Sequence, residues 1–221
     1  MATIVITGAN RGIGLELARQ YADEGHEVIR AMRGPDRADP IFGTTMALDV
    51  TDAESVRKFA AGLMDRPVDL LVANAGVISP ERQSSTDMDF DGFLHTLDVN
   101  VLGPLRVIQA LLPNLRRAAH PKIAITSSRM GSMASAQSGF IAYRASKAAA
   151  NKVAQCVATD LAGEGIAVAS LHPGWVRTDL GGPGADLDVE TSAAGLRRVL
   201  DGLSTENSGR FWAYDGEELD W

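Results

Sequence analysis

The sequence has one cysteine, Cys156, among 221 residues, so an internal disulfide is excluded. Free thiols without disulfides are typical of a reducing compartment. The chain also lacks a run of roughly 18 apolar residues, the length needed to span a membrane, and no basic stretch of a secretory signal precedes the apolar segment 3–7. We therefore expect a cytoplasmic protein without a membrane segment, in which Cys156 is a small buried residue of a helix.

Acidic residues outnumber basic ones, 28 to 21, which leaves a net charge of −7. A negative surface repels phosphate backbones and anionic lipids, so neither nucleic acid nor a membrane surface is an expected partner. His26, His95 and His120 have no cluster of cysteines or carboxylates at ligand spacing, and no metal site is predicted. Hydrophobic residues make up 45% of the chain, as in ordinary globular proteins. No linker or repeat divides it, so we expect one domain over 1–221.

Short segments rich in β-branched residues alternate with longer segments of helical period. The predicted strands are 3–7, 27–32, 45–48, 70–73, 122–127, 166–171 and 210–214, and the long predicted helices are 88–118 (bent near Pro104), 141–161 and 189–203. Thr51 and Glu54 form a capping box before a shorter helix, and the link from 32 to 45 has room for a very short helix at most. The pattern predicts an α/β protein, a single Rossmann-type doubly wound domain with a parallel seven-stranded sheet and helices on both faces.

Three glycines lie where the first predicted strand runs into a helix. Gly8, Gly12 and Gly14 have the spacing G-xxx-G-x-G, directly after the strand 3–7. Glycines at such a junction let the backbone approach a ligand closely, and the start of the helix offers free N–H groups to a pyrophosphate. A tight turn without a ligand would also need glycine, but the flanking strand and helix favour a dinucleotide site.

The end of the second predicted strand indicates which dinucleotide is bound. An acidic residue there would bond the ribose 2′-hydroxyl of NAD, but the sequence has Met32 followed by Arg33. Arg33 and Arg11 of the glycine loop would form a clamp for a 2′-phosphate, which predicts NADP(H). The alternative is that both arginines are solvated surface residues. Asp49, after the third strand, either contacts adenine or belongs to the cap of the next helix.

Tyr143 and Lys147 lie one turn apart on the predicted helix 141–161. A phenol ionises near pH 10, and a nearby ammonium stabilises the phenolate, which lowers the pKa toward the working pH. Taken alone, this pair is common on helix surfaces. Ser128 ends a buried strand, where its hydroxyl would face the crevice at the carboxyl edge of the sheet, and Asn100 is an unusual residue for the interior of a helix.

In this order the motifs resemble those of the short-chain dehydrogenase/reductase family, over residues 3–178. They are TGxxxGxG, an Asn-Ala-Gly loop, the helical Asn, the Ser with YxxxK, and a Pro-Gly segment before a Thr. The resemblance implies that Tyr143 is the catalytic acid–base, and that Lys147 lowers its pKa and holds the nicotinamide ribose. It also implies that Ser128 bonds the substrate carbonyl and that Asn100 supports a water relaying protons. The residues implied to bind the cofactor are Gly8, Asn10, Arg11, Gly12, Ile13, Gly14, Arg33, Asp49, Val50, Asn74, Ala75, Gly76, Tyr143, Lys147, Pro173, Gly174, Val176 and Thr178.

Two departures from the family pattern affect the substrate side. Ser128 stands 15 residues before Tyr143, whereas 13 is common, so Ser127 and Ser132 stay open as alternatives. The segment 178–190, where relatives often carry a longer lid, is short, which predicts an open and permissive pocket.

The resemblance is to the small carbonyl-reductase-like members related to C-factor, and it implies an NADP(H)-dependent enzyme. The reaction would interconvert an aldehyde or ketone with an alcohol. An alternative is an NADP-binding signalling protein with little turnover; an epimerase or dehydratase is less compatible with the glycine spacing and the chain length. The family also implies a homodimer or tetramer, assembled through the helix 143–161 and the long helix before Pro121.

Overall fold

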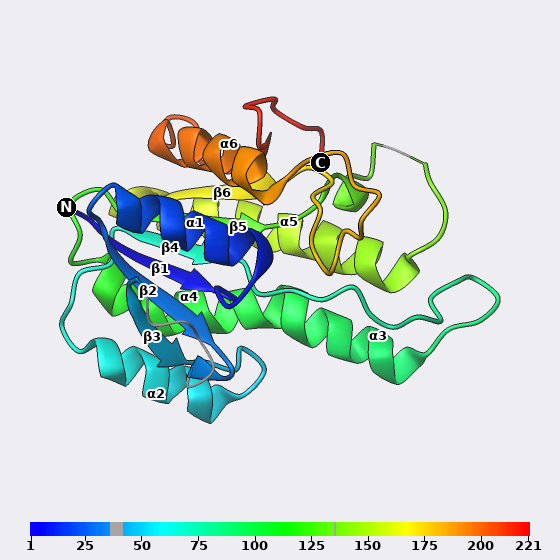
Figure 1. The fold of residues 1–221 in the computed structure, drawn as a ribbon, viewed down its shortest axis with the longest axis horizontal. Coiled ribbons are helices and arrows are strands. Elements are labelled where there is room, and N and C mark those ends of the chain that lie inside the picture. Colours follow the sequence, from blue (N-terminus) through cyan, green and yellow to red (C-terminus); the bar gives the residue numbers. More distant parts are fainter. Residues whose placement is uncertain (36–41, 135) are drawn as a thin grey trace.

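The computed structural model describes residues 1–35, 42–134 and 136–221. Seven strands formed by these residues make one parallel sheet in the order β3-β2-β1-β4-β5-β6-β7 (Figure 1). They are β1 (Thr3–Thr7), β2 (Glu27–Met32), β3 (Thr44–Ala47), β4 (Leu70–Ala73), β5 (Lys122–Thr126), β6 (Ala167–His172) and β7 (Arg210–Ala213). The strand order reverses between β1 and β4, the place where doubly wound sheets bind ligands. The predicted Rossmann-type α/β fold is confirmed.

Helices cover both faces of the sheet (Figure 1). One face carries α1 (Gly12–Asp23) and α6 (Val189–Asp201), and the other carries α2 (Ala53–Leu63), α4 (Gly103–Leu115) and α5 (Ile141–Leu161). Successive residues of a strand point to opposite faces, so Ile4 and Ile6 pack beneath α1, whereas Val5 packs on the other side. Two apolar cores thus hold the sheet between its helices and fix the loops at its carboxyl edge.

The predicted strand and helix boundaries differ from the observed ones by one or two residues at several ends. The third strand begins and ends one residue earlier than predicted, and α6 ends at Asp201 rather than 203. The link that was expected to hold at most a very short helix includes residues 36–41, which lie outside the described residues. In the part of the chain that the structure describes, no helix is both long and apolar enough to cross a membrane.

The long helix predicted over 88–118 is interrupted. It consists of α3 (Phe90–Leu97), a π-helical segment η2 (Asp98–Leu102) and α4. Pro104 lies in the first turn of α4 and has no N–H to donate to the carbonyl four residues earlier, which belongs to Asn100. π-helical segments widen a helix and are frequent at functional sites. The irregularity therefore surrounds Asn100, rather than producing the simple bend expected at Pro104.

The cap of α2 also differs from the predicted one. The Asp52 carboxylate, not the Thr51 hydroxyl, accepts hydrogen bonds from the backbone N–H groups of Glu54 and Ser55, at 3.0 and 3.2 Å. The Thr51 hydroxyl instead donates to Asp49 at 2.6 Å. Asp is as good an N-cap as Thr, and the carboxylate of Asp49 competes for the Thr51 hydroxyl.

Candidate active site

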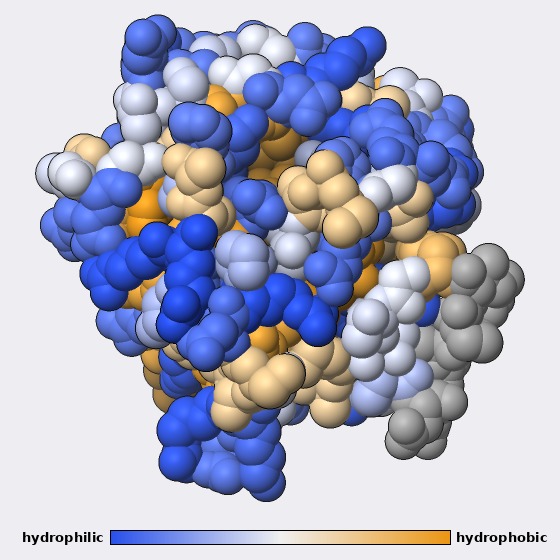
Figure 2. Space-filling view, turned by 90° about the vertical axis from the view of Figure 1, so that its left-hand side faces the viewer, coloured by the Kyte–Doolittle hydropathy of each residue, from blue (hydrophilic) through white to orange (hydrophobic). Residues whose placement is uncertain are grey.

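The loops that follow β1, β4, β5 and β6 meet at the carboxyl edge of the sheet, and α5 begins beside them (Figure 1). The opposite end of the molecule, which Figure 2 faces, is mostly hydrophilic, with apolar surface showing between polar side chains. A cavity of about 660 Å³, lined in part by the second half of α5 and by Ile166 just before β6, is remote from this edge. Cys156 lines that cavity and is exposed, so the expectation that it is buried is wrong. It faces away from the sheet, whereas Ala150, Ala154 and Val157 face the core.

Tyr143 and Lys147 occupy the first two turns of α5. Both are buried, with exposed fractions of 7% and 4%. The Lys147 Nζ lies 5.6 Å from the centre of the Tyr143 ring. Its hydrogen bond goes to the backbone oxygen of Thr126, at 2.8 Å, at the end of β5. The helix thus places the phenol and the ammonium side by side, and β5 anchors the ammonium.

Ser128 follows β5 and opens a short 3₁₀ turn, η3 (Arg129–Gly131). Its hydroxyl oxygen accepts a hydrogen bond from the Met130 N–H at 3.2 Å, and its side chain lies close enough to the Tyr143 phenol to lower the pKa of that phenol. The two alternative serines are engaged elsewhere: the Ser127 hydroxyl donates to the Lys147 carbonyl at 3.2 Å, and Ser132 accepts from the Ala134 N–H at 3.3 Å. Among the three serines, the described contacts bring Ser128 to the phenol.

Burial raises the pKa of Tyr143 to about 12, and the hydrogen bond from Ser128 opposes this rise. The prediction that Lys147 lowers the pKa of Tyr143 below its ordinary value is therefore wrong for this structure. The reason is desolvation, which disfavours the charged phenolate. At neutral pH the phenol is fully protonated, the state required of a proton donor.

Burial also lowers the pKa of Lys147, to about 8. Loss of water disfavours the charged ammonium, as it disfavours the phenolate. The hydrogen bond to the Thr126 oxygen, at 2.8 Å, holds the amine in place. Lys147 is thus still mostly charged at neutral pH, and it titrates about one unit above it.

Asn100 in η2 is fully enclosed. Its Oδ1 accepts from the Val77 N–H, and its Nδ2 donates to the Val77 oxygen and to the Ser146 hydroxyl, all at 2.9 Å. Gly76 lies between Asn100 and Lys147, since a Cβ at Gly76 would lie 3.3 Å from the Asn100 Oδ1 and 3.6 Å from the Lys147 Nζ. The amide therefore fixes the loop after β4 and closes the space beside the ammonium.

The glycine loop after β1 is packed as a dinucleotide loop requires. Gly8 has φ of 68°, which favours glycine, and a Cβ there would lie 2.9 Å from the Ala75 Cα. A Cβ at Gly14 would lie 2.5 Å from the Asn74 Nδ2. No side chain of the described residues caps α1, so the N–H groups of its first turn are available to an anion. Asn10 and Ile13 belong to this loop and turn, which fit a pyrophosphate.

Asn74 ties three strand ends together. Its backbone N–H donates to the Thr7 hydroxyl at 3.0 Å, and its Nδ2 donates to the Thr7 oxygen at 3.2 Å. Its Oδ1 accepts from the Thr126 hydroxyl at 3.4 Å. The Asn-Ala-Gly loop is thereby fixed between the ends of β1 and β5, next to the glycine loop.

The two arginines expected to clamp a 2′-phosphate lie in different loops, Arg11 after β1 and Arg33 after β2. The Arg11 guanidinium forms an ion pair with Asp179, at 2.5 Å, and both side chains are largely exposed. Arg33 is exposed at the end of β2. The pKa of Asp49 is lowered chiefly by its hydrogen bond from the Thr51 side chain and, to a lesser degree, by the charge of Arg33. The Asp49 carboxylate accepts from the Thr51 hydroxyl and N–H, so it does organise the turn before α2. Val50 is buried against Gly103.

The segment after β6 reaches back over the glycine loop. The Pro173 oxygen accepts from the Ser192 hydroxyl at 2.6 Å, and Gly174 has φ of 85°. Farther on, a Cβ at Gly12 would lie 3.2 Å from the Thr178 side chain. Val176, two residues before Thr178, is buried. Of the predicted cofactor residues in this segment, Thr178 thus packs against the start of α1.

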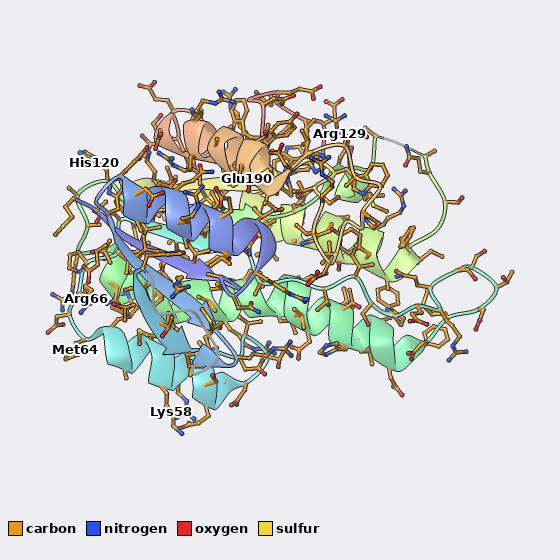
Figure 3. All side chains as sticks on the ribbon, in the orientation of Figure 1. Lys58, Met64, Arg66, His120, Arg129 and Glu190 are labelled. Carbon is orange, nitrogen blue, oxygen red and sulfur yellow. The ribbon has the colours of Figure 1, made fainter. Side chains whose placement is uncertain are left out.

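Some residues that support the candidate site through contacts with sequence-distant partners were not predicted from the sequence. The Gln83 side chain, in the loop between β4 and α3, accepts a hydrogen bond from the Tyr143 N–H. Arg129, labelled in Figure 3, pairs with Glu217 at 2.5 Å, and the Trp221 oxygen accepts from the Met133 N–H at 2.9 Å. These partners are far apart in the sequence and have no motif, so no local signal could have found them.

No group of three or more metal-ligating side chains occurs within residues 1–35, 42–134 and 136–221. A family model described as short chain dehydrogenase matches residues 2–186.

Similar proteins include two curated relatives and one solved structure. C-signal of Myxococcus xanthus is 47% identical over 167 residues, which cover 75% of this chain and 100% of that protein. The 1-hydroxy-2-glutathionyl-2-methyl-3-butene dehydrogenase of Rhodococcus sp. (strain AD45) is 39% identical over 230 residues, with all of both chains covered. The crystal structure of NADPH-bound carbonyl reductase from chicken fatty liver has a TM-score of 0.89 and 29% identity, covering 100% of this chain and 99% of that one.

Proposed function

Because the chain belongs to the short-chain dehydrogenase family, we propose that it is an NADP(H)-dependent oxidoreductase that interconverts an aldehyde or ketone with an alcohol. The observation that carries the proposal is the buried set of Ser128, Tyr143 and Lys147, in which the phenol is protonated and the serine lies beside it. A protein that only binds a dinucleotide has no need of such a proton donor.

The reaction follows from what each side chain can donate. The Tyr143 phenol gives its proton to the carbonyl oxygen as that oxygen gains negative charge. The Ser128 hydroxyl, beside the phenol, donates a hydrogen bond to the same oxygen and orients the substrate. The charge of Lys147 stabilises the phenolate that remains, and Asn100, across Gly76 from the ammonium, supports the water through which the proton is restored. The hydride chemistry itself belongs to the nicotinamide when the cofactor is bound.

The cofactor is held by the glycine loop, the Asn-Ala-Gly loop and the segment after β6. The packing of Gly8 against Ala75 and the uncapped first turn of α1 support a pyrophosphate at this place. NADP(H) rather than NAD(H) is supported by Arg33, because the strand before it ends in Met32 and not in a carboxylate. When the cofactor binds, Arg11 breaks its ion pair with Asp179 and joins Arg33 in binding the 2′-phosphate. The similar chicken carbonyl reductase binds NADPH.

The substrate is a small carbonyl compound or alcohol, and the short segment 178–190 leaves its pocket open. The net charge of −7 supports neither nucleic acid nor a membrane surface as a partner. The enzyme works as a single domain over 1–221 in the cytoplasm, and as a homodimer or tetramer through α4 and α5. Leu105, Leu112 and Val153 on these two helices pack against the chain's own core but are only partly buried by it, which leaves part of each side chain for a second copy.

One alternative is a signalling protein that binds NADP(H) with little turnover. It is supported by the 47% identity to C-signal. Turnover separates the two functions: we expect the purified protein to consume NADPH, followed by its absorbance, with at least one member of a panel of aldehydes, ketones and quinones. NADPH binding without consumption across the panel would favour the signalling function.

A further inference from the structure

The first turn of α5 begins at a residue that cannot cap it. Phe140, which precedes Ile141, has φ of 52° and no side-chain acceptor. The first N–H groups of a helix have no carbonyl partner within the helix. One of them belongs to Tyr143, whose exposed fraction is 7%, so water is no ready substitute. A buried N–H without a partner destabilises the folded state, and α5 therefore needs an acceptor from elsewhere.

Gln83 supplies that acceptor from the loop between β4 and α3. Its Oε1 accepts from the Tyr143 N–H at 3.1 Å, and its backbone oxygen accepts from the Ile141 N–H at 3.1 Å. Its Nε2 donates to the Pro80 oxygen at 2.6 Å, which holds the amide with its oxygen toward α5. The exposed fraction of Gln83 is 6%. One buried residue thus closes the amino end of the helix at the catalytic tyrosine.

Lys147, one turn later, is anchored to a different part of the molecule. Its Nζ donates to the Thr126 oxygen at 2.8 Å, and its carbonyl accepts from the Ser127 hydroxyl at 3.2 Å. The turn after β5 also packs on it, since a Cβ at Gly131 would lie 2.6 Å from the Lys147 carbonyl carbon. The ammonium is therefore fixed by β5, whereas the turn carrying the phenol is fixed by Gln83.

We propose that Gln83 is a positioning residue that sets the place of the Tyr143 phenol relative to Ser128 and Lys147. This inference rests on the proposed function, because it takes Tyr143 as the proton donor. Without the Gln83 oxygen, the first turn of α5 loosens and the phenol leaves Ser128, while Lys147 keeps its place. Misplacing a reacting group by about 1 Å can lower the rate roughly 100-fold.

Two substitutions test the acceptor oxygen. Gln83→Met keeps the length of the side chain but removes the acceptor. Gln83→Glu, whose carboxyl is kept protonated by burial, restores an oxygen toward Tyr143 and an O–H toward the Pro80 oxygen. Asn114→Leu is the matched control. Asn114 has an exposed fraction of 4%, and its Nδ2 donates to the Met64 and Arg66 backbone oxygens at 2.9 and 2.8 Å. It is a buried amide of the same kind, at the end of α4 and remote from Tyr143.

The measurements are kcat for a carbonyl substrate, the Kd of NADPH and the melting temperature of each variant. We expect Gln83→Met to lower kcat by about tenfold or more with the Kd of NADPH unchanged, and Gln83→Glu to recover most of the loss. Asn114→Leu should lower the melting temperature to a similar degree without lowering kcat. A kcat for Gln83→Met equal to that of Asn114→Leu overturns the proposal.

Hydrogen exchange of the backbone at 141–145 tests the same proposal without turnover. Faster exchange there in Gln83→Met than in Asn114→Leu supports it, and equal exchange overturns it. If the unmodified protein has no turnover, the proposed function fails, and Gln83 is judged by exchange alone. If Gln83→Met does not fold, Gln83→Asn, whose amide is one methylene shorter, takes its place in both measurements.

Discussion

The Lys147 Nζ lies 5.6 Å from the centre of the Tyr143 ring, but it gives its hydrogen bond to the Thr126 backbone oxygen. The ammonium is thus placed to stabilise a phenolate that forms during the reaction, while burial keeps the resting phenol protonated, with a pKa of about 12. Ser128 lies beside the phenol and lowers its pKa. In the proposed function, Tyr143 would therefore be ready to donate its proton at neutral pH, as carbonyl reduction requires.

The pH dependence of reduction should report on Lys147. Its pKa is lowered to about 8, so its charge is present below that pH and is lost above it. We expect kcat for carbonyl reduction, measured at saturating NADPH, to fall as the pH rises through about 8. In Lys147→Arg, which stays charged, any remaining activity should not fall in this range. A wild-type kcat that is constant up to pH 10 would contradict the assignment.

Lys147 should destabilise the folded protein at neutral pH, although its charge supports the proposed reaction. A lysine whose pKa falls from 10.5 to about 8 on folding destabilises the folded state below pH 8, where both states are charged. The cost is roughly 3 kcal/mol at 1.36 kcal/mol per pKa unit, partly offset by the bond to the Thr126 oxygen. We expect Lys147→Met to have an equal or higher free energy of unfolding at neutral pH, measured with urea.

The contribution of Lys147 to the free energy of unfolding should also change with pH. Between about pH 8 and 10.5 the unfolded chain binds a proton at Lys147 that the folded chain does not, so the wild type gains stability with rising pH. Lys147→Met lacks this gain. The difference in unfolding free energy between the two proteins should therefore move in favour of the wild type across that range. A difference that stays constant would show that Lys147 is not desolvated.

Cofactor preference should depend on Arg33. A hydrogen bond to a charged group contributes about 1.5–3 kcal/mol, so Arg33→Ala should weaken NADPH binding by roughly 10- to 150-fold. NADH, which lacks the 2′-phosphate, serves as the internal control and should bind nearly as before. Arg11→Ala should have a smaller effect, because Arg11 must first leave Asp179. Equal affinity of the unmodified protein for NADH and NADPH, measured by titration, would refute the role of Arg33.

Assembly through α4 and α5 predicts a particle of at least twice the 23.4 kDa mass of the chain. Light scattering at micromolar concentration measures it directly. A monomeric mass at that concentration would count against the homodimer and the tetramer alike.

The sequence predicted those features that are encoded locally. The apolar strand before Gly8 and the helix after Gly14 identified the glycine loop, and the four-residue spacing placed Tyr143 and Lys147 on one helix face. The proximity of Ser128 to Tyr143 was also predictable, because Ser128 follows a strand and Tyr143 begins a helix at the same edge of the sheet. Boundaries shifted by a residue or two where neighbouring hydrogen bonds, rather than propensity, decide the last residue of an element.

The sequence could not predict features that depend on distant partners. The bond from Tyr143 to Gln83 spans 60 residues, and the Arg11 ion pair with Asp179 spans 168. The pKa of Tyr143 depends on how much water the folded chain removes, which no spacing reveals. The π-helical segment at Asn100 was not predicted either, because the apolar periodicity on both sides of it is that of one continuous helix.

The most direct test of the account is the turnover of Tyr143→Phe, which removes the phenol oxygen and leaves the ring in place. Steady-state reduction of the best carbonyl substrate should fall by about 100-fold or more, the usual effect of losing a general acid. NADPH binding, measured by titration of the same sample, should be unchanged. Turnover close to that of the unmodified protein, with NADPH still bound, would contradict the central claim that Tyr143 is the proton donor.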